Sequence, residues 1–435
     1  MVIRDLAHEV TRRVEAVGDG LSEAFFEPVV RVGVTGLARS GKTVFITSLV
    51  ANLLDRGRMP QLGAAADGRI VAAYLQPQPD LTVPRFDYEA HYAAMTGQTP
   101  QWPESTRAVS ELRLSFKVQP NGLLSGFQGP RTVHLDIVDY PGEWLLDLAL
   151  LDRTYQDWSD QVLTRLVERT EAAAYLDQLQ GLDATARLEE PAAQKLAAGF
   201  TDYLTQARDA GYYDCTPGRF LLPGDLAGSP VLTFAPLPNA DMPARRSLWR
   251  EMERRFEAYK SKVVKPFFRD HFARIDRQVV LVDALGAIHK GPKAVEDMRQ
   301  AMAAILESFR PGKNAFLTRL LRGKRVERLL FAATKADHLH HRQHARLTAI
   351  MGALTRDAQD RARFAGAKVD AMSIASLRAT VEETLKHEGR DLDCVRGRLT
   401  RDCLDHPAAR LDKRPPVYRH SKAARARNPD RALRV

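Results

Sequence analysis

The sequence predicts an α/β fold in which a mostly parallel β-sheet is flanked by helices. The first observation is a β-branched run at 29–35, followed by a glycine-rich loop and an apolar helix from Val44. The second is a set of short apolar runs, 132–139, 278–283 and 328–333, whose ends carry polar or acidic residues. The third is helical periodicity between the later runs, as the crossovers of a parallel sheet require.

The glycine-rich loop reads Gly-Leu-Ala-Arg-Ser-Gly-Lys-Thr and fits the pattern G-x-x-x-x-G-K-[ST]. Between a strand and a helix, this pattern is typical of the phosphate-binding loop of P-loop NTPases. Loop N–H groups and the positive end of the helix dipole attract phosphates. We expect Lys42 to reach the β- and γ-phosphates and the Thr43 hydroxyl to ligate Mg²⁺. Nucleotide contacts are expected from Gly36, Ala38, Arg39, Ser40, Gly41, Lys42 and Thr43.

A second motif, Asp139-Tyr140-Pro141-Gly142, ends the apolar run 132–139 and has the D-x-x-G arrangement of GTPases. Asp139 would hold Mg²⁺ through water, and the Gly142 N–H would contact the γ-phosphate. Turns often produce this pattern by chance, so its value comes from its order after the P-loop and its place at a strand end. Glu143 follows, where small GTPases have a water-orienting Gln. It is a catalytic candidate that acts through a bridging water, or faces away if the phosphate repels it.

A third motif, Thr334-Lys335-Ala336-Asp337, follows the run 328–333 and matches [NT]-K-x-D. Asp337 could accept hydrogen bonds from guanine N1–H and the 2-amino group, while Lys335 lays its aliphatic stem along the base. A later loop is expected to present a backbone N–H of Ala375 or Ser376 to guanine O6, and the register between these two stays open. The predicted ligands are GTP or GDP with Mg²⁺.

Two polar residues complete the expected site. The threonine that caps Mg²⁺ should precede the alternating strand 110–118, and Thr106 is preferred to Thr82 and Thr99 because it lies immediately before that strand. Arg39 lies inside the P-loop, which is similar to the loop of guanylate-binding proteins, where this arginine is an internal catalytic finger. A solvent-facing Arg39 is the alternative, and both interpretations stay open.

The composition of the chain argues against a membrane-spanning or disulfide-bonded protein. The chain has 435 residues and 44% hydrophobic content, and no apolar run reaches the roughly 18 to 20 residues of a membrane span. Its three isolated cysteines predict neither a disulfide nor a cysteine metal site and fit a cytoplasmic protein. Most of the formal net charge of +10 comes from 410–435, with nine Lys or Arg and two Asp. Nucleic acid is therefore not an expected partner, and contact with an anionic membrane stays open.

The chain divides into five expected segments: an amphipathic N-terminal helix at 1–27, the first part of a nucleotide domain at 28–142, a helical insertion at 143–277, the second part at 278–395, and a basic, disordered tail at 396–435. The stretch from the P-loop helix to Ser110 is rich in Pro and Gly and is expected to be a long irregular loop. The large aromatic residues of the insertion are expected in a core: Trp158, Trp249, Phe267 and Phe268.

The P-loop with its helix Val-Phe-Ile-Thr-Ser-Leu-Val-Ala-Asn-Leu-Leu, the Asp139–Trp144 junction and the Thr-Lys-Ala-Asp motif resemble the bacterial YcjX-like family over about residues 1–400. No resemblance is expected beyond Thr400. The resemblance implies a GTPase with a large helical insertion, associated with envelope stress. We also expect a protein effector of unknown identity, and a cytoplasmic location that could be peripheral to the inner membrane. Three classes stay open: a GTP-hydrolysing regulatory switch, a dynamin-like mechanochemical GTPase assembling through the insertion, and a nucleotide-binding scaffold with negligible turnover.

Overall fold

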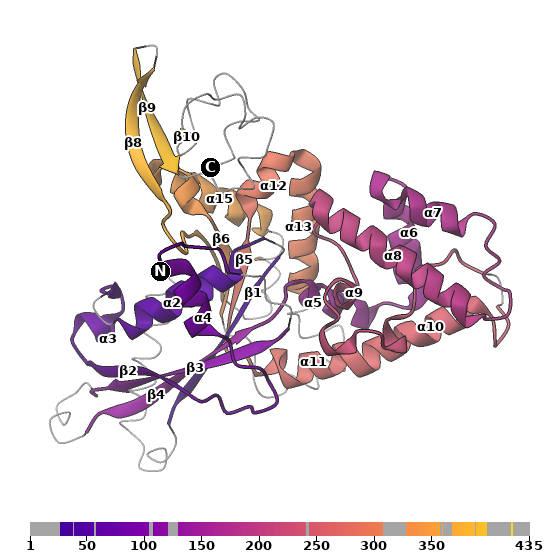
Figure 1. Ribbon diagram of the computed structural model, residues 1–435, viewed down its shortest axis with the longest axis horizontal. Helices are drawn as coiled ribbons and strands as arrows, with labels where there is room; N and C mark the ends of the chain where they lie inside the picture. Colours follow the sequence, from indigo (N-terminus) through magenta and orange to yellow (C-terminus); the bar gives the residue numbers. More distant parts are fainter. Residues whose placement is uncertain are drawn as a thin grey trace.

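A seven-stranded sheet in the order β2-β3-β4-β1-β5-β6-β7 forms the centre of this computed structural model (Figure 1). The structure describes residues 27–37, 39–55, 58–103, 108–120, 129–240, 243–307, 328–356, 359, 368–387, 389–397 and 419–420. The expected N-terminal helix up to residue 26, Ala38, Thr106 and most of the expected tail lie outside these residues.

Parallel pairing dominates the sheet, which confirms the predicted α/β class. The strands are β1 (Val29–Gly36), β2 (Ile70–Gln76), β3 (Ser110–Val118), β4 (Arg131–Asp139), β5 (Arg277–Val282), β6 (Arg328–Ala333) and β7 (Lys368–Ser373). Strands β4, β1, β5, β6 and β7 run parallel, while β3 is antiparallel to β4 and β2 to β3. The carboxyl ends of the parallel strands therefore meet at one edge.

Strand β2 corrects the expectation of an irregular loop before Ser110. It is an edge strand of the sheet, and only Ile70 is fully buried in it. Two helices share this stretch, α3 (Gly63–Ala66) and α4 (Tyr88–Thr96). Because an edge strand has a weak apolar pattern, its pairing with β3 defines it more than its own sequence does.

Each face of the sheet has its own hydrophobic core. Along β6, Leu329 and Phe331 belong to one cluster and Leu330 and Ala332 to the other, as the alternation of a strand requires. The α2 helix (Lys42–Leu54) covers one face with Ile46, Val50 and Leu53. Helices from 143–277 cover the other face and share a continuous core with it.

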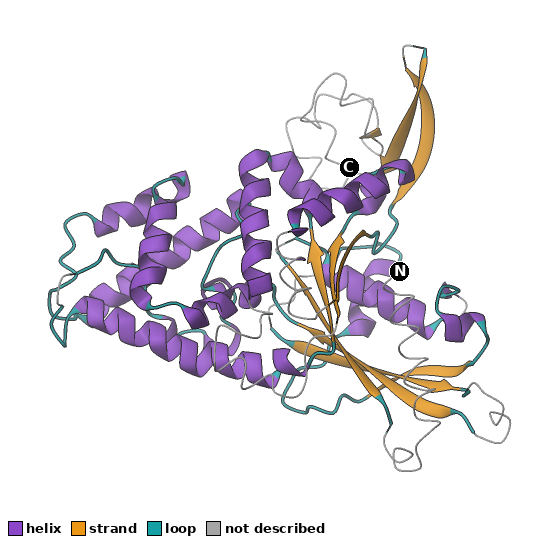
Figure 2. Ribbon diagram, turned by 180° about the vertical axis from the view of Figure 1, so that it is seen from behind, coloured by secondary structure: helices purple, strands orange, loops and turns teal. Residues whose placement is uncertain are grey.

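The expected insertion is helical and extends away from the sheet (Figures 1 and 2). It contains α5 (Glu143–Leu146), α6 (Tyr155–Leu166), α7 (Ala173–Leu179), α8 (Glu190–Ala210), α9 (Gly218–Leu221), α10 (Leu248–Tyr259), a π-helical turn (Lys260–Val264) and α11 (Lys265–Asp270). Trp158, Trp249, Phe267 and Phe268 are all buried, which confirms their expected core role.

The chain then forms α12 (Ala284–Lys290), α13 (Pro292–Glu307) and α15 (His344–Leu354) around β6 and β7. A hairpin of β8 (Thr380–His387) and β9 (Arg390–Gly397), which the sequence did not predict, projects from the body (Figure 1). Strand β9 passes the expected domain end at 395, and β10 (Arg419–His420) pairs with it inside the expected disordered tail. Among the described residues, none of the helices combines the length and apolar character needed to cross a membrane.

Candidate nucleotide-binding site

The three sequence motifs meet at the carboxyl edge of the parallel strands. The P-loop follows β1, the D-x-x-G segment ends β4, and the Thr-Lys-Ala-Asp segment follows β6. The loop after β7 joins them at the same edge. Open α/β sheets bind ligands at this edge, so the predicted site residues among the described positions lie where a ligand would be bound.

Left-handed backbone shapes the P-loop. Gly41 has φ 75° and precedes α2, whose first turn includes the bond from Phe45 N to Gly41 O at 2.9 Å. A Cβ on Gly36 would lie 2.0 Å from Ser40 Oγ and 3.0 Å from Ser40 Cβ, so a larger residue there would displace the Ser40 side chain. Arg39 has φ 64°, a strained conformation that non-glycine residues hold mainly at functional sites.

Lys42 and Asp139 form an ion pair inside this loop, with Nζ and Oδ1 2.6 Å apart. The Lys42 side chain is 10% exposed and the Asp139 side chain 1%. Lys42 is therefore held against the end of β4. Among the described residues, the Asp139 carboxylate has no polar partner besides the Lys42 ammonium. A buried carboxylate paired only with a cation suits a metal-bound water, and the hydroxyl-bearing Thr43 is also buried.

The D-x-x-G segment packs directly on the P-loop. A Cβ on Gly142 would lie 2.4 Å from Gly36 O and 3.0 Å from Leu37 N. Upstream, Thr35 Oγ1 donates to Tyr140 O at 3.1 Å. Gly142 therefore packs the end of β4 against the P-loop backbone, which we expect to bind phosphate.

Glu143 begins α5 at this junction and is partly buried. Burial raises the pKa of its carboxyl group, and the charge of Lys42 opposes that rise. A raised pKa means that this carboxyl group takes up a proton more readily than an ordinary glutamate, and protonation would remove its repulsion from a γ-phosphate. Gly218 of the insertion lies against it, because a Cβ there would be 2.4 Å from Glu143 O.

The Thr-Lys-Ala-Asp segment is held by neighbouring strands. Thr334 N donates to Val282 O at 2.9 Å. Lys335 has φ 59°, and its Nζ lies 2.6 Å from Asp283 Oδ2. Asp283 also caps α12 by accepting from Gly286 N at 2.9 Å. Sequence reasoning missed this role of Asp283, although an acid at the end of an apolar strand was visible in the sequence.

The loops after β6 and β7 are joined by their backbones. Ala336 N donates to Ile374 O at 3.0 Å, next to Ala375 and Ser376. Asp337 is 8% exposed, and its Oδ2 accepts from Ala379 N at 3.3 Å. The Ser376 hydroxyl is buried and has no hydrogen-bond partner among the described residues. Such an orphaned group in the loop after β7 is a candidate ligand contact.

Tyr213 of the insertion and Lys290 of α12 approach the P-loop residue Arg39. Burial raises the pKa of the Tyr213 hydroxyl, Asp283 adds to the rise and Arg39 opposes it. Burial together with the Arg39 charge lowers the pKa of Lys290, whose Nζ donates to Ala210 O at 3.3 Å. Arg39 itself is exposed. The sequence gave no signal for this approach, because it arises from the folding of residues far apart in the chain.

This arrangement is that of an α/β P-loop NTPase. The chain belongs to the YcjX-like family (DUF463), whose model matches residues 30–428. The expectation that family resemblance ends near Thr400 is therefore wrong, because the match continues to 428. The chain is 40% identical over 387 residues to the "Ras-like GTPase YcjX" of Escherichia coli (strain K12), covering 86% of this chain and 83% of that protein.

A second relative with the same description comes from Shewanella oneidensis (strain MR-1). It is 38% identical over 392 residues, which cover 85% of this chain and 81% of that protein. Both similarities include most of each chain, so they reach the nucleotide site and the helical insertion alike.

Proposed function

We propose that the protein binds and hydrolyses GTP in the presence of Mg²⁺. The observation that carries this proposal is the meeting of three motifs at one sheet edge, where Gly142 packs on Gly36 and Lys42 pairs with Asp139. The relatives named as Ras-like GTPases support it. The P-loop N–H groups and Lys42 would bind the phosphates, and the nucleotide would draw Lys42 away from Asp139.

Guanine selection is assigned to Asp337. A carboxylate can accept from both N1–H and the 2-amino group of guanine, a pair of donors that adenine lacks. Its burial strengthens these bonds, and its loop is fixed to the loop after β7 by the Ala336 N to Ile374 O bond. Backbone N–H groups of Ala375 or Ser376 are assigned to guanine O6.

Catalysis is assigned to Arg39, Lys42 and Glu143. Mg²⁺, held through Thr43 and Asp139, supplies charge neutralisation at the phosphates. Arg39 would stabilise the charge that spreads over the γ-phosphoryl oxygens, and its exposed side chain is free to fold over them. Glu143, with its raised pKa, would position the attacking water by hydrogen bonding. Thr106 remains the proposed cap for Mg²⁺.

The role we propose is that of a regulatory switch in the bacterial envelope stress response, with a protein effector. It rests on the family resemblance and on the contact of α9 with the first residues of the insertion, which follow Gly142 directly. Gly218 N donates to Asp147 Oδ1 at 2.7 Å, and the Arg219 guanidinium lies 3.2 Å from the centre of the Trp144 ring. A movement of the segment after Gly142 would therefore be passed to the insertion.

The test is phosphate release from GTP and from ATP by the purified full chain, with Mg²⁺ or with EDTA. We expect turnover of GTP that EDTA abolishes, and little turnover of ATP. Equal turnover of both nucleotides would contradict guanine selection, and absence of GTP binding would contradict the function itself. Repeating the assay over a range of protein concentrations, with and without phosphatidylglycerol vesicles, tests the mechanochemical alternative, because assembly raises turnover per chain.

A further inference from the structure

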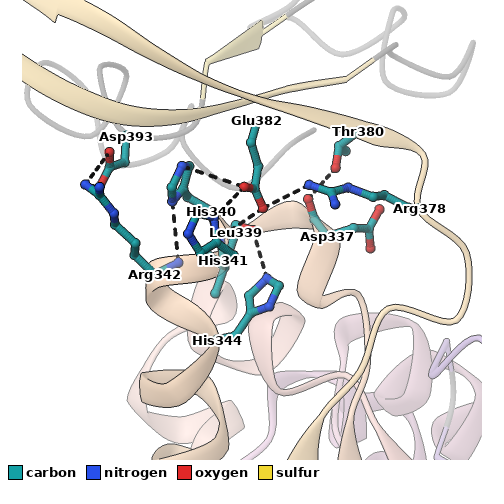
Figure 3. A network of polar contacts seen from close by, with 10 residues as sticks. All are labelled: Asp337, Leu339, His340, His341, Arg342, His344, Arg378, Thr380, Glu382 and Asp393. Carbon is teal, nitrogen blue, oxygen red and sulfur yellow. Dashed lines mark hydrogen bonds and ion pairs between the residues drawn. The ribbon is translucent and has the colours of Figure 1, made fainter. Parts of the chain in front are cut away.

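A cluster of histidine and glutamate side chains lies outside the nucleotide contacts described above. It is formed by His340 and His341, which follow the Thr-Lys-Ala-Asp segment, and by Glu382 of β8 (Figure 3). One ligand atom from each residue lies within 4.8 Å of the others. The chain reads Ala-Asp-His-Leu-His-His-Arg-Gln-His at 336–344, a histidine-rich tract of the kind that binds metals.

We propose that His340, His341 and Glu382 bind a divalent transition-metal cation of the zinc class, which fastens the β8–β9 hairpin to the segment behind the guanine-reading Asp337. Two imidazoles and one carboxylate are the donor set of a three-ligand zinc site that keeps one position for water. Mg²⁺ and Ca²⁺ prefer oxygen ligands alone, so this donor set disfavours them.

The carboxylate is oriented by its neighbours before any cation binds. Glu382 Oε1 accepts from His341 N at 2.9 Å and lies 3.0 Å from the Arg378 guanidinium. This leaves Oε2 turned toward the two imidazole rings, 2.6 Å from His341 Nδ1 and 3.7 Å from His340 Nε2. Outer hydrogen bonds of this type fix the orientation of metal ligands in proteins.

One of the two distances suits a shared cation, and the other is that of a hydrogen bond between His341 and Glu382. Two donor atoms on a tetrahedral zinc ion are about 3.4 Å apart. The 3.7 Å separation of His340 Nε2 and Glu382 Oε2 is too long for a hydrogen bond and close to this value. His341 Nδ1 must move outward by roughly 1 Å to bind the same ion. Its side chain is 63% exposed, so nothing packed around it prevents that movement.

The charged side chains next to the cluster are already paired. The nearby Arg342 is paired with Asp393 of β9, with NH1 3.2 Å from Oδ1 (Figure 3). Glu382 is the one carboxylate of the three ligands, and a divalent cation bound by it would compete with the Arg378 guanidinium for its negative charge. His340 is 7% exposed, so one of the three proposed ligands is buried and held in place by its surroundings.

Binding would connect two segments that already touch. Thr380 Oγ1 donates to Asp337 O at 2.5 Å, and Ala379 N donates to the Asp337 carboxylate. A cation at Glu382 would hold β8 at a second point, two residues further along the strand. The hairpin and the Asp337 loop would then move as one unit.

The experiment uses the full chain stripped with EDTA and titrated with ZnSO₄ against a chromogenic zinc indicator. The variants are His341→Ala, whose exposed side chain can be removed without a cavity, and Glu382→Gln, which keeps the shape of the carboxylate. The control is His344→Ala, from the same tract, because His344 Nε2 faces Leu339 O instead of the cluster. Nucleotide is left out of all titrations, so the result does not depend on the proposed GTPase function.

We expect the wild type and His344→Ala to hold Zn²⁺ at least about tenfold more tightly than the other two variants. We also expect Zn²⁺ to raise the Tm of the wild type and of the control only, because a ligand that binds the folded state stabilises it. Equal Zn²⁺ affinity in all four proteins would overturn the proposal. So would a wild type with no Zn²⁺ binding in competition with the indicator.

Discussion

Gly142 touches the backbone of Gly36 so closely that a Cβ on Gly142 would lie 2.4 Å from the Gly36 carbonyl oxygen. This contact joins the end of β4 to the P-loop and leaves no room for a larger residue. If a bound nucleotide moves the segment after Gly142, we expect the movement to begin at this direct contact with the P-loop. A substitution of Gly142 should therefore disturb the site directly.

For Gly142→Ala we expect at least about a tenfold loss of GTP turnover, because small displacements of reacting groups are costly in rate. Phosphate release under saturating GTP measures it. Gly63→Ala is the matched control, since a Cβ there meets nothing within 4 Å. Wild-type turnover in Gly142→Ala would show that this contact is not part of the working site.

Lys42→Ala should lose GTP binding and also destabilise the nucleotide-free protein. The structure pairs Lys42 with the buried Asp139, so removing the lysine leaves an uncompensated buried charge, at a cost of about 3 to 5 kcal/mol. The double variant Lys42→Ala/Asp139→Asn should recover much of the lost Tm without recovering GTP binding. Thermal unfolding and GTP titration of both variants check this, and a single variant with unchanged Tm would speak against the pair.

Arg39→Ala is expected to lower kcat for GTP at least about tenfold while changing GDP affinity little, because a transition-state contact is missing in the product complex. Arg39→Lys keeps the charge and a side chain at the φ 64° position, so it controls for backbone effects. We expect it to rescue poorly, since a point charge does not reproduce the planar fork. If kcat is unchanged in Arg39→Ala, the internal-finger assignment is wrong, and Glu143 or an activating partner takes its place.

Asp147 should make stability fall as pH rises. Burial raises the pKa of its carboxyl group from 3.8 to about 6, against hydrogen bonds from Tyr259 and Gly218 N that lower it. The folded state therefore holds the proton more tightly than the unfolded state, and this stabilisation, present below pH 3.8, is lost as pH rises through about 6. The loss is at most about 3 kcal/mol.

Asp147→Asn removes this titration while its amide can still accept from Gly218 N and donate to Tyr259. Urea unfolding at pH 4.5 and pH 7 should show the variant gaining stability relative to the wild type at the higher pH. A stability difference that is the same at both values of pH would mean that Asp147 does not titrate in this range.

The sequence predicts the parts of the site that lie next to buried strands. The P-loop, Asp139 and Asp337 each follow an apolar run, so local pattern places them at the sheet edge without knowledge of the rest of the fold. Strand β2 and the β8–β9 hairpin have weak apolar patterns and are defined by pairing, so local sequence does not predict them.

The sequence also does not predict contacts between residues that are far apart in the chain. The Lys335–Asp283 pair joins residues that follow two different strands, and the Lys42–Asp139 pair joins two motifs that are far apart in the sequence. The approach of Tyr213 to the P-loop depends on how the insertion folds back on the sheet. Such contacts require the order of the strands and the path of the insertion, which a single sequence does not contain.

The measurement that tests guanine recognition most directly is the affinity of wild type and Asp337→Asn for GTP and XTP. Asn offers an N–H donor to the 2-oxo group of xanthine but cannot accept from both guanine donors. Asp391→Asn, on the exposed side of β9, is the control. We expect the wild type and the control to prefer GTP, and Asp337→Asn to lose GTP affinity by roughly 10- to 100-fold and to prefer XTP. An Asp337→Asn protein that still prefers GTP as strongly as the wild type would contradict the account.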